Sequence, residues 1–408
     1  MFKNIDINKV LKGSIISFGF FPIIPDGLKG GLVIFLLLIS IIVFVRNPHK
    51  NLNFKWFFIS SGIYFAYLIS FFYTENIEEY VKTVLETRLS MLVIPFSFLL
   101  ITKNSSIGDQ IKNRFEKIFI FSTSIFCVYY LFNVLYFYLS VEGTSQLVIV
   151  SFFRSVIKIM PLIGVHPIYG AVYIGVAVVL LLTTVNIKGI YKFLLGSLFA
   201  TVLLMLSSKM GILSTFLVSA IYVFNKYAVN TYRKVIVIVG IIISLILVYK
   251  VPIVNQRSKE IFTFKTYNQF DYHNSSSIRF NIYKCAANVI ENNFWFGVGA
   301  GDVQDELHKE YAKVNCLLIQ NDFNSHNQYL SIQLGTGIIG LLIFLLFLGK
   351  NIVFSLNGKN RITYFMLTLF YMINLISENL LERQNGVILF YFIMCFYSFS
   401  SFHLKKNP

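Results

Sequence analysis

Apolar segments long enough to cross a lipid bilayer recur along this chain from one end to the other. A perpendicular helical span needs about 20 predominantly apolar residues, and a water-soluble domain cannot accommodate many segments of that kind. Of the 408 residues, 56% are hydrophobic and only 13% are charged, about half the charged share that is typical of soluble proteins. The sequence therefore predicts an all-α polytopic membrane protein with no separate soluble domain.

About twelve segments are candidates for transmembrane helices, although several are shorter than a perpendicular span requires. Between the third and the fourth, residues 73–88 interleave acidic and apolar side chains, as is typical of an amphipathic helix at a membrane surface. The twelve segments cover roughly residues 11–25, 28–45, 54–72, 89–101, 115–139, 167–184, 191–206, 211–224, 235–249, 329–348, 362–379 and 386–402.

The charges are distributed unevenly between the loops, although the formal net charge of the chain is +16. If both ends lie in the cytoplasm, the short cytoplasmic loops hold most of the lysines and arginines, as the positive-inside rule requires. Only Asp6, Asp109 and Glu116 among the acidic residues then lie inside. The predicted organisation is nine spans over residues 1–249, a large periplasmic loop with short helices over 250–328, and three spans over 329–408.

Several classes of partner and cofactor have no support in the sequence. The basic residues fall in short loops, and no basic helix with interleaved aromatic residues is present, so we expect membrane lipids and no nucleic acid as partners. The chain contains no Walker loop and no HExxH, CxxC or Asp-x-Asp motif. We therefore expect no metal site, no cofactor and no ATP-driven transport.

The long loop contains a helical pattern that begins at Ser277-Ile278-Arg279, with an apolar face formed by Ile282, Ala286, Val289 and Ile290. Arg279 presents five donors in a fork that fits a phosphate group. The alternative is that Arg279 neutralises lipid headgroups or pairs with a loop carboxylate such as Asp271.

Two further features of this loop concern its backbone and its cysteines. Gly297 and Gly299 follow the helical pattern, and glycines allow the backbone to approach a ligand closely. Cys285 and Cys316 both fall in the loop, so a disulfide could form in an oxidising compartment, although unpaired thiols are common in membrane proteins.

His326 stands where the long loop leads into the tenth span, within the stretch Ser325-His326-Asn327-Gln328. The unperturbed pKa of histidine, about 6.5, suits proton transfer at neutral pH. Asn327 beside it could orient a sugar hydroxyl or the imidazole. The alternative interpretation is a solvated loop histidine with no role in chemistry.

Other polar residues fall on the same predicted outer face. His166 precedes Pro167 at the start of the sixth span, and a helix N-terminus that faces outward can bind an anion. Ser208 and Lys209 lie in the turn between the seventh and eighth spans, and Glu378 lies at the outer end of the eleventh, close to Glu382 and Arg383. A snorkelling lysine or an interfacial glutamate is ordinary, so only the shared location of these residues is informative.

These residues together resemble the motifs of one family of membrane proteins. The stretch from Ser277 to Arg279 with its helix, Gly297-Val298-Gly299, and His326 with its downstream glycines resemble the bacterial O-antigen ligase and O-antigen polymerase superfamily. The stretches 166–169 and 208–211 are similar to two upstream motifs of that family. The resemblance covers essentially the whole chain, and it depends on the order and shared topology of short motifs.

The resemblance implies a metal-independent glycosyltransferase of the bacterial inner membrane. Such an enzyme takes a glycan from undecaprenyl diphosphate on the periplasmic face and joins it to an acceptor hydroxyl, on a lipid A core or another glycan. A direct displacement of the diphosphate would invert the anomeric centre. It implies that Arg279 binds the diphosphate and that His326 is the catalytic base or orients the acceptor. Lys209 stands where the family usually has arginine, and it is expected to bind substrate with His166, Ser208, Gly297, Gly299, Asn327 and Glu378.

Three alternatives to a ligase remain open at this point. A polymerase, which joins lipid-linked repeat units, shares the same motifs. A lipid-linked glycan flippase would be expected to place basic residues along a central cavity and to lack a large extracytoplasmic loop. A membrane scaffold without catalytic activity is the third alternative.

Overall fold

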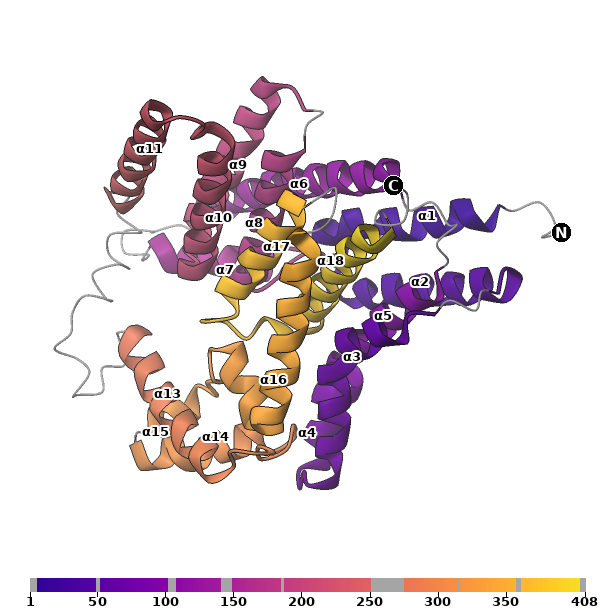
Figure 1. Cartoon of the computed structure of the whole chain (residues 1–408). Helices are drawn as coiled ribbons and strands as arrows, with labels where there is room; N and C mark the ends of the chain where they lie inside the picture. Colours follow the sequence, from indigo (N-terminus) through magenta and orange to yellow (C-terminus); the bar gives the residue numbers. More distant parts are fainter. Residues whose placement is uncertain are drawn as a thin grey trace.

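The computed structural model of the chain describes residues 6–48, 52–101, 108–140, 149–184, 187–250, 275–314, 316–356 and 361–403. Over these residues every regular element is a helix, and none is a strand. Figure 1 shows the long helices packed side by side, with a group of short helices at one end of the molecule. The all-α class that the sequence predicts is confirmed.

The first helices of the chain begin where short polar side chains cap them. Asp6 accepts a hydrogen bond from the backbone N–H of Asn8, and Asn53 accepts one from the backbone N–H of Trp56. The elements of this part are α1 (Ile7–Ser17), a 3-10 helix (Phe18–Ile23), α2 (Asp26–Arg46), α3 (Phe54–Ile69), a 3-10 turn (Ser70–Phe72), α4 (Ile77–Tyr80), a π-helical segment (Val81–Thr87) and α5 (Ser90–Leu100).

The middle of the chain forms a second set of helices. α8 and α10 approach closely because Gly211 has no side chain; a Cβ there would lie 2.8 Å from the Cβ of Ala171. The elements are α6 (Asp109–Ser140), α7 (Ile149–Ile159), α8 (Pro167–Thr183), α9 (Gly189–Leu206), α10 (Lys209–Tyr227) and α11 (Thr231–Lys250).

Seven helices in the described part of the chain are long and apolar enough to cross a membrane. They span Asp26–Arg46, Phe54–Phe72, Ile77–Leu100, Asp109–Ser140, Gly189–Leu206, Lys209–Tyr227 and Gln328–Leu356. The helix Ile77–Leu100 contains most of the short span predicted at 89–101 together with most of the amphipathic segment 73–88. The chain is therefore a multi-pass membrane protein, while the number of twelve spans and their orientation remain predictions.

The carboxyl-terminal helix lies at the centre of the bundle. Every residue from Val387 to Phe396 is buried, and the helix contacts α2, α5, α16 and α17. A helix that is apolar on all sides is stable where protein or lipid surrounds it, and here other helices surround it. Phe392 stacks on Phe18 of the first 3-10 helix, with 3.9 Å between the ring centroids. The elements here are α16 (Gln328–Leu356), α17 (Arg361–Asn374), a 3-10 turn (Leu380–Glu382) and α18 (Gln384–His403).

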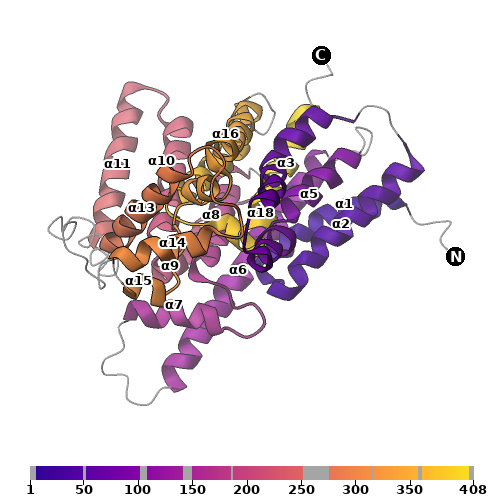
Figure 2. The same cartoon turned by 90° about the horizontal axis from the view of Figure 1, so that it is seen from below.

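The short helices α13 (Ser275–Asn292), α14 (Val303–Val314) and α15 (Cys316–Gln320) form a layer at one end of the molecule. Ile282, Ala286 and Val289 of α13 are buried against α14, which confirms the predicted apolar face. Figure 2 views the molecule from this end. The layer lies over one side of the molecule, and α1 and α2 on the other side are not covered by it. The domain boundary predicted at residue 250 falls next to residues 251–274, which lie outside the described part.

A backbone contact fastens this layer to α16. Gly337 interrupts α16 with φ 64° and ψ −168°, and a Cβ there would lie 2.1 Å from the carbonyl oxygen of Trp295. The backbone N–H of Val298 donates to the carbonyl of Leu334 at 2.7 Å, and that of Ile338 donates to the carbonyl of Phe294 at 2.9 Å. The first turns of α16 therefore hold the loop that follows α13 in a fixed position.

Candidate functional site

A cleft of about 150 Å³ lies at the end of the molecule that carries α13–α15. Three segments far apart in the sequence form its walls: the start of α8, the loop before α16, and the segment between α17 and α18. Its lining residues are His166, Ile168, Tyr169, Asp322, Phe323, Asn324, His326, Glu378, Asn379 and Arg383. Two histidines and Glu378 of the predicted site therefore lie in one cleft.

The backbone of His326 adopts a left-handed conformation, with φ 45°. This conformation is unfavourable for a residue other than glycine and persists only where neighbours enforce it. The backbone N–H of His326 donates to Oδ1 of Asn324 at 3.0 Å, and the Tyr283 hydroxyl donates to the His326 carbonyl at 3.2 Å. The strained backbone thus places the imidazole in the cleft wall, where its ring lies 5.8 Å from that of Phe323.

Both histidines of the cleft are neutral at pH 7. Burial lowers the pKa of His326 to about 4, and the positive charge of Arg279 adds to the effect. Burial also lowers the pKa of His166 to about 4, assisted by the charges of Lys158, Arg383 and Arg154. The sequence suggested an ordinary pKa near neutrality for His326, and the structure differs because the imidazole is largely enclosed. A neutral imidazole can accept a proton.

Arg279 forms an ion pair with Glu378, with 3.1 Å between Nη2 and Oε1. Glu378 is 6% exposed, so its carboxylate is largely removed from solvent. Arg279 itself does not line the cleft, but its partner Glu378 does. The alternative partner considered from the sequence, Asp271, lies outside the described residues.

Lys209 and Ser208 lie at the start of α10. The Ser208 hydroxyl accepts a hydrogen bond from the backbone N–H of Gly211 at 3.3 Å and so caps α10. The Lys209 amino group donates to the hydroxyl of Ser275 at 2.8 Å. Ser275 lies one helical turn before Arg279 in α13. Lys209 therefore contacts the first turn of the helix that carries Arg279.

The remaining predicted residues contact other parts of the protein and do not line the cleft. Asn327 caps α16, since its Oδ1 accepts from the backbone N–H groups of Tyr329 and Leu330 at 2.9 and 3.2 Å. A Cβ at Gly297 would lie 2.3 Å from the Leu334 carbonyl oxygen, and one at Gly299 would lie 2.3 Å from the Thr74 hydroxyl. Helix capping and close backbone packing account for these three residues, and their contact with substrate stays a prediction.

Sequence reasoning did not assign Arg383 to the site, although it lines the cleft with its exposed side chain. Its position next to Glu382 suggested only the end of a span. Arg154 was also missed: its Nη1 donates to the carbonyl of Leu206 at 3.1 Å, and its charge reaches both His166 and Glu378. The available signal in the sequence was an arginine within the strongly amphipathic segment 149–159. In the described part of the loop, Cys285 is a buried free thiol.

The comparison with known families bears on this cleft. Residues 194–345 match the family model described as O-antigen ligase. This part of the chain is therefore similar to the O-antigen ligase family. The matched segment runs from α9 into α16 and contains Lys209, Arg279 and His326. His166, Glu378 and Arg383 lie outside it, at the ends of or between the flanking helices. The chain matches no curated protein.

Proposed function

We propose that this protein is a membrane glycosyltransferase of the ligase type. It transfers a glycan from undecaprenyl diphosphate to an acceptor hydroxyl, on a lipid A core or a similar glycan, at the periplasmic face of the bacterial inner membrane. The observation that carries the proposal is the position of His326: it lies inside the O-antigen ligase family segment, and its neutral imidazole faces a cleft surrounded by cations.

The proposed reaction forms one bond, breaks one bond and transfers one proton. The acceptor oxygen attacks the anomeric carbon of the donor, the bond from that carbon to the diphosphate oxygen breaks, and its electron pair leaves with the diphosphate. His326 accepts the proton of the acceptor hydroxyl. A direct displacement of this kind inverts the anomeric centre and needs no cofactor.

Cations near the cleft support the departure of a diphosphate. Negative charge develops on the leaving group, and fixed positive groups stabilise it more strongly in the transition state than in the ground state. Arg383 lines the cleft directly, and Arg279 forms an ion pair with Glu378, which also lines the cleft. These arginines supply the positive charge in our proposal.

Binding of the diphosphate changes the basicity of His326. A pKa of about 4 makes the imidazole of the free enzyme a weak base. An anion in the cleft raises the pKa of a nearby histidine, because it stabilises the protonated form. In our proposal the donor thus strengthens the base that its own transfer requires.

Surface glycan from a strain that lacks this protein tests the proposed function. If the protein is a ligase, the deletion strain accumulates full-length polymer on its lipid carrier, and the acceptor carries none. Surface glycan of a single repeat unit would instead identify a polymerase, which the family description equally accommodates. Unchanged surface glycan and no stranded carrier would contradict both activities.

A further inference from the structure

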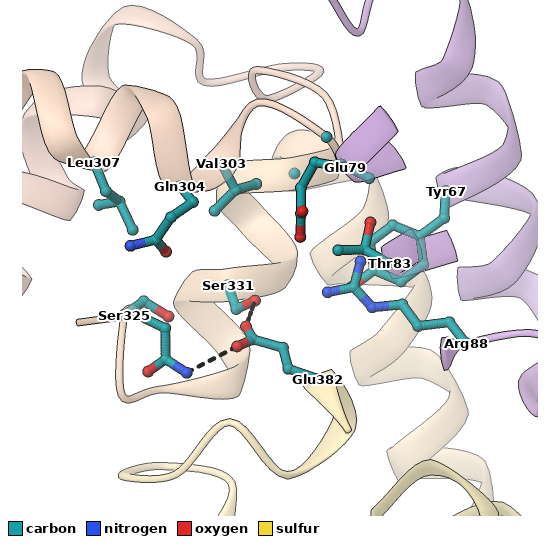
Figure 3. A pocket seen from close by; sticks show the side chains of 14 residues that line it. Tyr67, Glu79, Thr83, Arg88, Val303, Gln304, Leu307, Ser325, Ser331 and Glu382 are labelled. Atoms are coloured by element: carbon teal, nitrogen blue, oxygen red, sulfur yellow. Dashed lines mark hydrogen bonds between the residues drawn. The ribbon is translucent and has the colours of Figure 1, made fainter. Parts of the chain in front are cut away.

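A second cleft of about 150 Å³ lies beside the first and shares Asn324 with it. Residues from the end of α3, the segment before α5, the start of α14 and the first turns of α16 form its walls. Figure 3 shows Glu79, Arg88, Gln304, Ser331 and Glu382 around this space. None of these five side chains belongs to the site described above.

Arg88 is the unusual member of this second cleft. It is 6% exposed, and its guanidinium carbon lies 4.4 Å from the ring centre of Tyr67. Its Nε is buried and has no hydrogen-bond partner among the described residues, and neither does the buried hydroxyl of Tyr67. In Figure 3 the guanidinium extends across the cleft toward Ser331 and Glu382.

Glu382, on which the charge of Arg88 acts, is already occupied by other donors. Glu382 accepts hydrogen bonds from the Ser331 hydroxyl, from the Asn379 amide at 2.6 Å and from the Asn324 amide at 2.9 Å. Among the described residues, no ion pair joins Arg88 to Glu382 or to another carboxylate. A buried arginine with donors left unused is costly, so its donors are expected to serve a group that binds there.

The local backbone is built to place Arg88 at this point. The π-helical segment Val81–Thr87 ends immediately before it, and α5 begins two residues later. π-Helical turns are rare and frequent at functional sites, and irregular backbone within a membrane span is tolerated where it lines a cavity. The break falls inside the candidate span Ile77–Leu100, so it interrupts a helix that could otherwise be continuous.

We propose that this second cleft is a glycan subsite, which holds one sugar residue while the neighbouring cleft carries out transfer. Arg88 and the Tyr67 hydroxyl donate to oxygens of the sugar, and Glu79 and Gln304 bind its hydroxyl groups. Carboxylates, amides and hydroxyls around a polar space match a ligand that is both donor and acceptor of hydrogen bonds. This inference rests on the proposed function, and the sugar comes from either the donor glycan or the acceptor glycan.

Gly335 offers a variant that narrows the second cleft without disturbing the fold. A Cβ there would lie 3.4 Å from Val303 Cγ2, 3.6 Å from Ala300 Cα and 3.7 Å from Tyr67 Cε1, which are ordinary contacts. All three neighbours line the cleft. Gly349 of the same helix has no atom within 4 Å of such a Cβ, so Gly349→Ala is the matched control.

The test is glycan binding to the full-length protein in lipid nanodiscs, measured by calorimetry. The probes are the delipidated surface glycan of the source bacterium and, separately, its core oligosaccharide without that glycan. We expect Arg88→Gln to weaken binding of one probe about tenfold or more, because it loses one charged hydrogen bond. Gly335→Ala should weaken binding of the same probe, because its methyl group narrows the cleft. Gly349→Ala should bind as wild type does. The probe that is affected identifies the source of the sugar.

Unchanged binding of both probes by Gly335→Ala and by folded Arg88→Gln would overturn the subsite, as would a wild type that binds neither probe. If Arg88→Gln does not fold, Gly335→Ala alone decides between these results. Binding is independent of turnover, so a protein that binds glycan through Arg88 but transfers none would contradict the proposed function and leave the subsite standing.

Discussion

Removing both partners of the Arg279–Glu378 ion pair distinguishes a structural arginine from a substrate-binding one. Arg279→Met alone leaves Glu378 buried without its cation, and breaking a buried pair typically costs about 3–5 kcal/mol. Because a quarter of the Arg279 side chain is exposed, we expect about 2–3 kcal/mol here. Glu378→Gln in the same chain removes the uncompensated charge, so the double variant should regain most of that stability.

Activity should respond differently from stability. Loss of a donor that stabilises developing charge costs about 10²–10³ in turnover. If Arg279 stabilises the diphosphate, the double variant stays that much slower than wild type even though its thermal stability returns. The assay compares thermal unfolding and glycan transfer for wild type, both single variants and the double variant. Recovery of wild-type turnover in the double variant would refute the role of Arg279 in diphosphate binding.

Three further predictions follow from the structure. kcat/KM should stay level from about pH 8 to 6 and fall only as the pH approaches about 4, because the free enzyme holds His326 neutral above its lowered pKa; a transition near 6.5 in the pH–rate profile would contradict this. Gly337→Ala should destabilise the protein by at least about 1–3 kcal/mol in thermal unfolding, while Gly349→Ala should not; equal stabilities would contradict the packing of α16. Reporter fusions at Arg233 should read cytoplasmic and those at Glu79 periplasmic, and one reversed reporter would overturn the topology.

Local periodicity predicted the helices well because it depends on neighbouring residues. The pattern beginning near Ser277 predicted α13, and the structure confirms its buried face of Ile282, Ala286 and Val289. The membrane class also followed from the apolar runs. Span ends were harder to predict: the span placed at 89–101 extends back to Ile77, because a π-helical segment continues it through acidic residues.

The candidate site could be predicted only in part, because its contacts join residues distant in the sequence. His166, His326 and Glu378 were all named from the sequence, and they meet in one cleft. The pairing of Arg279 with Glu378, 99 positions away, depends on how α13 lies against the segment that follows α17. A lone Arg88 after an acidic stretch suggests a surface charge, and only tertiary packing shows that it is buried.

For the two glycines that follow α13, the sequence predicts the backbone freedom correctly but does not predict what that freedom is used for. Gly297 and Gly299 do adopt the positive φ that only glycine takes easily, at 71° and 99°. Their freedom was interpreted as room for a ligand, whereas in the structure protein atoms occupy that room. Sequence alone does not say whether a close approach is to a ligand or to another segment of the chain.

Transfer of glycan from a synthetic undecaprenyl-diphosphate donor by purified protein tests the central claim most directly. Wild type should form the glycosidic bond, and His326→Ala should lower turnover by about 10²–10⁴ while its expression stays normal. Gly349→Ala, at a position where a new methyl group meets no atom within 4 Å, is the control variant and should keep wild-type turnover. Normal turnover and an unchanged pH–rate profile in His326→Ala would contradict the role of His326 as the base.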